Sequence, residues 1–286
     1  MLDTIKGIIL DIDGVIVGSK KGVNSPDPHP DVIKRLKQIK EGGIPISLCT
    51  AKPYFAIEKI VREANLDNVH IVNGGGAIMN PITGKIVKTH SIDQTILRSI
   101  LEMLLKEDVY TELYTVEDYY IQKSQYRHIT DKHTHVLQRE PKVVESLLDE
   151  ISSLKVVRIL AVTEDREDRY IFEDKFKPFT DSLNLGWGVH PVILPLQFGG
   201  ITPKGISKSH GAVEIAENFG VSLNDMLGVG DSKRDWEFIG QCGYGAAMGN
   251  ASQALKDLVL TKEKSRSYIG GDVDENGILE ILDYFI

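Results

Sequence analysis

The chain has 286 residues, which is long enough for two domains of ordinary size. Hydrophobic residues make up 42% and charged residues 26%, as in soluble globular proteins, and no apolar run approaches the roughly 18 residues of a membrane helix. The net charge is −8 and no long basic block occurs, which argues against nucleic-acid binding as the main function. A site for a small anionic substrate is not excluded by these values.

The N-terminus and the cysteines indicate where the protein works. The acidic Asp3 comes early and the chain then enters a strand, unlike a signal peptide. Cys49 and Cys242 cannot make a disulfide framework, and both lie beside apolar or small residues. We therefore expect buried structural thiols, a cytoplasmic location, and neither a membrane nor a nucleic acid as partner. The oligomeric state, monomer or homodimer, stays open.

The first apolar run, residues 8–10, predicts a strand buried on both faces, as in a parallel sheet. It ends in two carboxylates, Asp11 and Asp13, followed by Gly14. Ligands of α/β sheets gather beyond the carboxyl ends of strands, and carboxylates this close repel each other unless a cation shares them. A hard divalent ion, most simply Mg²⁺, meets that need, although the same tetrapeptide is also a common strand-ending turn.

The next segments alternate between helical and strand patterns. We predict a helix from residue 31 to about 39, a strand over 44–48 that runs into Thr50, a helix over 54–64 and a strand over 69–72. This β-α-β-α-β order predicts a parallel sheet with right-handed crossovers. The following Asn73 opens a glycine run, residues 74–76, which lacks the spacing of a dinucleotide-binding loop and precedes a hairpin instead of a helix.

From about residue 90 the pattern changes, and we predict a separate α+β domain inserted over residues 89–200. Its expected elements are a helix over 96–104, paired strands over 110–122, a helix over 142–151, a strand over 156–162 and strand material over 187–198. Polar and basic residues gather near its middle. Lys123, Arg127 and His128 are candidate substrate contacts there, while a plain solvated loop is the competing interpretation.

The parallel pattern resumes after residue 200. Lys208 precedes a helix, a strand over 226–229 ends in Asp231 with Asp235 close behind, and a last strand over 243–248 ends before Asn250. The fold class is therefore α/β, with a Rossmann-like parallel-sheet core over residues 1–88 and 201–286 and the inserted domain between them.

Four strand ends carry reactive groups, and their order resembles that of the haloacid dehalogenase (HAD) superfamily of phosphatases. The matching segments are Asp11-Ile-Asp13-Gly-Val, Ile46-Ser-Leu-Cys-Thr50, Pro203-Lys-Gly-Ile-Ser-Lys208, and Gly230-Asp231-Ser with Asp235. The insertion between the second and third segments, the strand end at Asn73, and residues 247–251 resemble the Cof-type branch with a type IIB cap. The inserted domain matches by position and size only.

The resemblance implies roles for these residues. Asp11 would be the nucleophile, Asp13 the general acid and base, and Lys208 the cation that neutralises the intermediate, with Lys204 as the competing lysine. Asp11, Asp13 through its backbone carbonyl, and Asp231 would bind Mg²⁺, supported by Asp235 and Asn250. Thr50, the N–H of Ala51, and Arg234 would bind phosphate, and Asn73 would join the cap residues as a substrate contact. Two positions depart from the family pattern: Arg234 stands where Asn is usual, and Ala51-Lys52 where Gly-Arg is usual.

The function expected from the resemblance is a Mg²⁺-dependent phosphatase that hydrolyses a small phosphorylated metabolite, such as a sugar phosphate or phosphoglycolate, through an aspartyl-phosphate. A phosphomutase of the same fold is the first alternative. A non-catalytic binding protein with a relic site is the second, and Arg234 is the residue that favours it.

Overall fold

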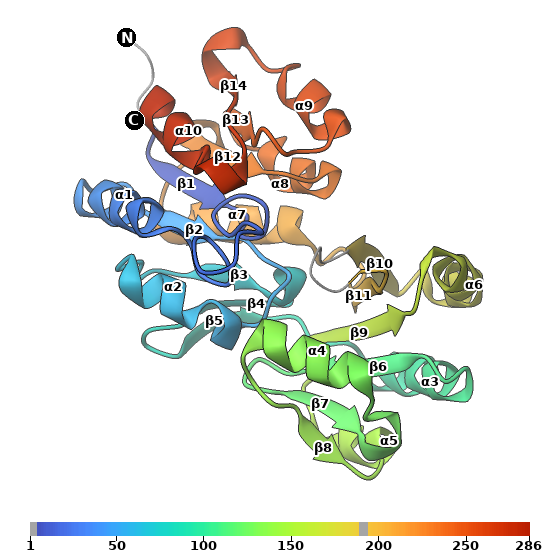
Figure 1. Ribbon diagram of the computed structural model, residues 1–286. Coiled ribbons are helices and arrows are strands. Elements are labelled where there is room, and N and C mark those ends of the chain that lie inside the picture. Colours follow the sequence, from blue (N-terminus) through green and yellow to red (C-terminus); the bar gives the residue numbers. More distant parts are fainter. Residues whose placement is uncertain (1–4, 189–193) are drawn as a thin grey trace.

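The computed structural model describes residues 5–188 and 194–286 (Figure 1). Its core is a five-stranded parallel sheet in the order β14-β13-β12-β1-β2. The strands are β1 (Gly7–Leu10), β2 (Ile46–Leu48), β12 (Met226–Gly230), β13 (Tyr244–Ala247) and β14 (Ser267–Ile269). Every residue of β1 is buried, as its unbroken apolar sequence predicts for a strand covered on both faces.

A three-stranded sheet continues the core beyond β2. It consists of β3 (His70–Val72), β4 (Ala77–Asn80) and β5 (Lys85–Thr89), in that order and antiparallel. A single parallel bridge between Cys49 and Ile71 joins it to the edge of the main sheet. The third predicted strand and the hairpin after it therefore take their expected places.

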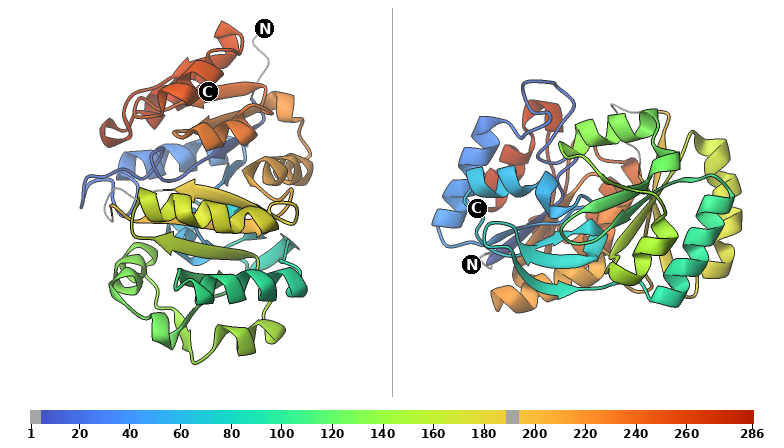
Figure 2. Two further views of the ribbon diagram at one scale, coloured as in Figure 1. Left: turned by 90° about the vertical axis from the view of Figure 1, so that its right-hand side faces the viewer. Right: turned by 90° about the horizontal axis from the view of Figure 1, so that it is seen from below.

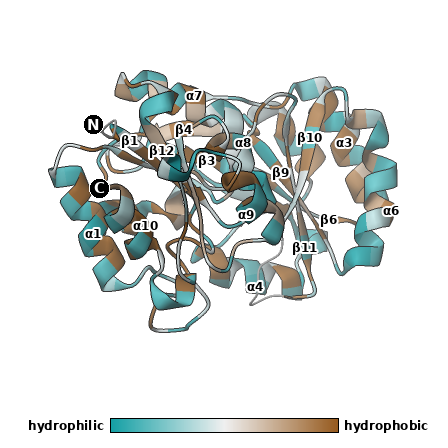
Figure 3. Cartoon of the chain, turned by 90° about the horizontal axis from the view of Figure 1, so that it is seen from above, coloured by the Kyte–Doolittle hydropathy of each residue, from teal (hydrophilic) through white to brown (hydrophobic). Residues whose placement is uncertain are grey.

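The helices of the core form two groups, and within each group neighbouring helices contact one another. One contains α1 (Pro30–Glu41), α2 (Glu58–Glu63) and α10 (Ile278–Phe285); the other contains α7 (Lys208–Phe219), α8 (Trp236–Ile239) and α9 (Gln253–Val259). Right-handed crossovers place the two groups on opposite faces of the sheet. Several helices alternate teal and brown along the ribbon in Figure 3, as amphipathic helices do, and α1 buries Val32, Leu36 and Ile39.

The inserted domain, called the cap below, is built on a six-stranded sheet in the order β10-β11-β9-β6-β7-β8. The strands are β6 (Tyr110–Tyr114), β7 (Tyr119–Gln122), β8 (Lys142–Val144), β9 (Arg158–Thr163), β10 (Leu183–Gly188) and β11 (Gln197–Pro203). Its helices are α3 (Gln94–Lys106), α4 (His128–Leu137), α5 (Leu147–Glu150) and α6 (Arg166–Phe176). The two views of Figure 2 show the cap stacked on one end of the core.

In the cap, one predicted helix is wrong and one observed helix is not predicted. Residues 142–144 form an edge strand paired with β7, and only the short α5 follows, because the β-branched Val143 and Val144 extend the sheet. The polar stretch, for which a solvated loop is the competing interpretation, contains α4, whose residues Ile129 and His133 are buried in the cap. A polar imidazole at that inward position hides the helical periodicity in the sequence.

Two linkers join the cap to the core. The first follows β5, where the His90 N–H donates to the Gly76 carbonyl oxygen and the Ile92 N–H to that of Val156. The second follows β11, which continues the cap sheet as far as Pro203 through its pairing with β10. Among the described residues, no helix is both long and apolar enough to cross a membrane.

Candidate active site

The site lies where the core strands end beneath the cap. Asp11 follows β1, Thr50 follows β2 by two residues, and Asp231 follows β12. β1 pairs in parallel with both β2 and β12, so all three residues emerge at one edge of the sheet. Asp11 is 8% exposed and Thr50 1%, so a ligand would reach them only through the space between core and cap.

Lys208 lies between two carboxylates. Its Nζ donates to Asp235 Oδ1 at 2.6 Å and is 3.0 Å from Asp11 Oδ2. Burial alone would lower the pKa of Lys208, but Asp11 and Asp235 raise it above its ordinary value, so the ammonium stays charged. Lys204, the competing candidate, lies in the second linker. Its side chain is exposed and its ammonium donates to the Thr180 carbonyl oxygen. The structure thus brings Lys208 to Asp11, the predicted nucleophile, whereas Lys204 lines the cavity between core and cap.

The backbone sets the position of Lys208. The residue begins α7, and the preceding Ser207 caps the helix by accepting the Ser209 N–H. Gly75, with φ of +100°, lies against Ser207, and a Cβ at Gly75 would be 2.5 Å from the Ser207 carbonyl oxygen. The glycine run over residues 74–76, which lacks the spacing of a dinucleotide-binding loop, therefore lets the end of the third strand approach the start of α7.

Asp235 is a supporting residue. Its Oδ2 accepts the N–H of Asp231 at 3.1 Å, and the N–H and hydroxyl of Ser232 at 2.9 Å each. Burial opposes the charged form, but Lys208 and these Ser232 donors hold the pKa of Asp235 below its ordinary value. Because both of its oxygens are engaged, Asp235 orients Lys208 and the Asp231 loop.

The acidic cluster fits a hard divalent cation. Asp11, Asp231 and Asp235 each offer an oxygen within 4.8 Å of the others. With Asp235 engaged elsewhere, Asp11 and Asp231 remain as ligands. Burial and the neighbouring Asp235 raise the pKa of Asp231 to about 7, and burial and Asp235 also raise the pKa of Asp11. A cation with oxygen preference would relieve this repulsion, and Mg²⁺ is such an ion.

These shifts predict that Mg²⁺ binding depends on pH. Below pH 7 the Asp231 carboxyl is protonated in the metal-free protein, so the ion must displace a proton; above it, the carboxylate is already formed. We expect the half-saturating Mg²⁺ concentration to rise at least about tenfold for each pH unit below 7. Calorimetric titration in two buffers of different ionisation enthalpy measures both affinity and proton release. Asp231→Asn should weaken this dependence, because one of the two titrating ligands is gone, and a flat profile in the wild type would contradict the assignment.

Asp13 faces the space between core and cap. Its side chain is 44% exposed, lines the cavity described next, and pairs with Lys52 Nζ at 2.7 Å. Thr50 accepts the Lys52 N–H on its hydroxyl oxygen, which leaves the hydroxyl proton for another acceptor. The Ala51 carbonyl oxygen accepts a hydrogen bond from Arg158 of the cap. The predicted phosphate-binding segment and the general acid are therefore neighbours.

A cavity of about 900 Å³ separates the core from the cap. Arg234 enters it from the core, and Arg158 and Trp187 from the cap. The Arg158 guanidinium carbon lies 5.6 Å from the centre of the Tyr114 ring. Burial is the main cause that lowers the pKa of Arg158, and the positive charge of Arg234 lowers it further. Gly186 makes room for Arg234, because a Cβ there would be 2.2 Å from Arg234 Nη2. The two guanidinium groups bring positive charge into the cavity, whose lining also includes Asp13, Glu173 and Glu237.

The three candidate contacts of the cap lie elsewhere. Lys123 pairs with Glu145 at 2.6 Å, Arg127 with Asp108 at 3.6 Å and His128 with Glu164 at 3.7 Å. None of the three is among the described residues that line the cavity. Arg158, which does line it, begins a strand in an apolar context and shows no sequence pattern that sets it apart.

The two asparagines take different places. Asn250 donates to the Gly14 carbonyl oxygen at 2.9 Å and accepts the Val273 N–H at 2.8 Å, so it ties the loop after β1 to the C-terminal segment. The Asn73 side chain is fully buried, and neither of its amide atoms has a hydrogen-bond partner among the described residues. Asn73 is therefore a candidate for contact with a ligand that carries polar atoms.

Comparison with known proteins places this site in a family. The family model for haloacid dehalogenase-like hydrolases matches residues 8–282. The chain is 21% identical to the phosphatase YwpJ of Bacillus subtilis, over 98% of this chain and 100% of that protein. The fold is similar to a haloacid dehalogenase-like hydrolase from Bacteroides thetaiotaomicron, with a TM-score of 0.82, 21% identity and coverage of 98% and 99% of the two chains.

The fold is also similar to a HAD subclass IIB sugar phosphatase, with a TM-score of 0.78, 21% identity and 98% of each chain covered. These neighbours confirm the predicted α/β fold, because both domains are matched in one superposition of almost the whole chain. The family model spans the loop after β1, the Lys208 segment and the Asp231 loop. The chain therefore belongs, as the four sequence segments predict, to the haloacid dehalogenase-like hydrolase family.

Proposed function

We propose that the protein is a Mg²⁺-dependent phosphatase that hydrolyses a small phosphorylated metabolite through an aspartyl-phosphate intermediate. The observation that carries this proposal is the Asp11 carboxylate, buried beside the Lys208 ammonium and Asp231 under the cavity that the two guanidinium groups enter. Phosphoryl transfer depends mainly on positioning and charge neutralisation, and these residues supply both. Several relatives are named phosphatases, which supports the same reaction class.

The chain's own residues account for each step of the proposed reaction. An Asp11 oxygen attacks phosphorus, the bond from phosphorus to the leaving oxygen breaks, and Asp13 gives that oxygen a proton. Asp13 then removes a proton from a water molecule, whose oxygen attacks phosphorus and releases Asp11. Lys208 offsets negative charge throughout. Mg²⁺ held by Asp11 and Asp231 would supply further charge neutralisation between the carboxylate and the phosphate.

Lys52 adds a positioning role that the family pattern does not include. Its ammonium holds the Asp13 carboxylate at 2.7 Å, and both residues line the cavity. A phosphate in the cavity would compete for Lys52 and free Asp13 to approach the leaving oxygen. The residue that replaces the usual arginine thus supports both phosphate binding and the orientation of the general acid.

The size and charge of the cavity favour a sugar phosphate as the substrate. A volume of about 900 Å³ lies in the range of sites for small organic molecules. Arg158 and Arg234 can donate to hydroxyl or anionic groups, and the Trp187 and Phe198 side chains offer apolar surface to a sugar ring. Residues 89–200, as a cap, would close over the site and contact the part of the substrate that carries no phosphate.

A phosphomutase is the second candidate, because the paired Arg158 and Arg234 could hold a second phosphate group. Assays of a panel of phosphorylated metabolites, with Mg²⁺ and with excess chelator, separate the two functions. Phosphate release that needs no bisphosphate activator supports the phosphatase. Isomerisation that requires one supports the mutase, and full hydrolysis in chelator would refute the metal role.

Replacement of Arg158 tests the assignment of substrate contacts. Arg158→Gln should lower kcat/KM for the best metabolite by about 10- to 100-fold, because one charge-assisted contact is lost. The loss on p-nitrophenyl phosphate should be smaller, since that substrate lacks the recognised group. Arg127→Gln is the matched control and should leave both activities unchanged, because Arg127 lies outside the cavity. Equal losses on both substrates for Arg158→Gln would show that the residue supports folding or the core site instead.

A further inference from the structure

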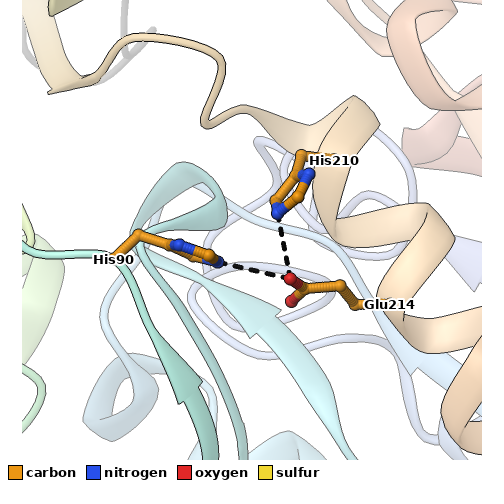
Figure 4. A group of neighbouring side chains, drawn as sticks. All are labelled: His90, His210 and Glu214. Atoms are coloured by element: carbon orange, nitrogen blue, oxygen red, sulfur yellow. Dashed lines mark ion pairs between the residues drawn. The ribbon is translucent and has the colours of Figure 1, made fainter.

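A second cluster of ligand-type side chains lies at the first linker (Figure 4). His90 directly follows β5, while His210 and Glu214 are one turn apart on α7 and project from the same side. Glu214 Oε1 is 2.9 Å from His210 Nε2 and 3.4 Å from His90 Nε2. The three ligand atoms all lie within 4.8 Å of one another. None of the three residues lines the catalytic cavity as described.

The polar atoms of this cluster are buried but poorly satisfied. Among the described residues, no hydrogen bond of regular geometry reaches His90 Nε2, His210 Nε2 or either Glu214 carboxylate oxygen. The short distances to Glu214 are those of ion pairs with the two imidazoles and with Lys88. A buried polar atom without a partner destabilises the fold. Three such atoms, one from each residue, lie within 4.8 Å of one another and indicate a ligand that accepts lone pairs from nitrogen and oxygen together.

Lys88 is the other charged group at the cluster. Its Nζ is 2.6 Å from Glu214 Oε1, and its side chain is 51% exposed. In the absence of a ligand this ammonium offsets the carboxylate charge. Since it already reaches solvent, Lys88 can turn outward and leave the carboxylate to another cation.

We propose that His90, His210 and Glu214 form a binding site for a transition-metal ion of the zinc class. Two imidazole nitrogens and one carboxylate are a known zinc ligand set, and neutral imidazole prefers Zn²⁺ to Mg²⁺. With metal–ligand distances of 2.0–2.1 Å, tetrahedral geometry separates ligand atoms by about 3.3 Å. The 3.4 Å and 2.9 Å separations around Glu214 Oε1 are close to that value.

The site would act on the position of the cap. His90 belongs to the first linker, whereas His210 follows Lys208 by two residues on the same helix. An ion bound to both would fasten the linker to the helix that carries the catalytic lysine. Nitrogen ligands distinguish this site from the oxygen ligands Asp11 and Asp231, so the two sites select different ions.

Zinc binding to the 286-residue chain tests the proposal. The chelator-treated protein, in a large excess of Mg²⁺ to occupy the carboxylate site, is titrated with Zn²⁺ against a chromogenic chelator. We expect one tight Zn²⁺ per chain in the wild type, and binding on the order of 100-fold weaker in His90→Gln and His210→Gln. His135→Gln, which replaces an exposed histidine of α4, is the matched control and should bind as the wild type does.

Two further measurements keep the result interpretable. Zn²⁺ should raise the Tm of the wild type and of His135→Gln, but not that of His90→Gln. Co²⁺ in the wild type should give the intense visible bands of a four-coordinate site with nitrogen ligands, which requires no variant to fold. Absence of these bands, or equal Zn²⁺ affinity in the wild type and both cluster variants, would overturn the proposal.

Discussion

Asp11→Asn should abolish turnover, with a fall in kcat of about 10⁵-fold or more. An amide carries no negative charge and is a poor nucleophile, so the bond to phosphorus does not form. The amide also removes one of the two carboxylates that remain free to bind the divalent ion. Initial rates on p-nitrophenyl phosphate at saturating Mg²⁺ measure the fall. Trapping with radiolabelled substrate should yield a phosphoenzyme in the wild type and none in the variant.

Asp27→Asn is the matched control for this result. It makes the same chemical change in the same domain, at a residue that pairs with Lys59 and lies outside the described lining of the cavity. We expect its turnover to equal that of the wild type. If Asp11→Asn retained more than about one hundredth of wild-type turnover, another group would have to be the nucleophile.

Asp13→Asn should reduce turnover by about 10²–10⁴-fold, the usual contribution of a positioned general acid or base. The loss should depend on the leaving group. An alkyl phosphate needs a proton on its leaving oxygen, whereas p-nitrophenolate leaves without one. The rate of the first step should therefore fall most with the alkyl substrate. The ratio of the two kcat/KM values, in variant and wild type, measures this difference.

The Lys52 pair makes the Asp13 experiment sharper. Asp13→Asn breaks an ion pair of 2.7 Å, which frees the ammonium to bind phosphate. KM for the aryl phosphate should therefore stay the same or fall while kcat falls. An equal loss of kcat/KM on both leaving groups would show that Asp13 supports the site without transferring a proton.

The catalytic core could be predicted from the sequence because strand position and chemistry coincide there. Asp11 and Asp231 each follow a buried apolar strand, so the parallel order alone brings them to one edge. The resemblance favours Lys208 over Lys204, because Lys208 occupies the family's position directly before an amphipathic helix, and the structure places it against Asp11. Local pattern and tertiary position agree at these residues.

The cap could not be predicted in the same detail, for reasons that particular residues make clear. His133 occupies an inward position of α4 and contacts both oxygens of the buried Glu112 at 2.8 Å. This polar pair conceals a core helix, because burial of charge depends on a partner distant in sequence. Arg158 reaches the cavity from a strand of otherwise buried residues, and its role depends on Ala51 and Arg234 in the other domain.

The contact between Gly75 and Ser207 has a consequence for how this enzyme can diverge. The backbone of Gly75 lies against the backbone of Ser207, so no side chain separates the third strand end from the start of α7 at this point. Substitutions at other positions add no atom to this contact. The contact does not accommodate even one methyl group at position 75, because any side chain there would push the start of α7 away. A reaction that requires fixed charges is thus compatible with a sequence that retains little else in common with its relatives.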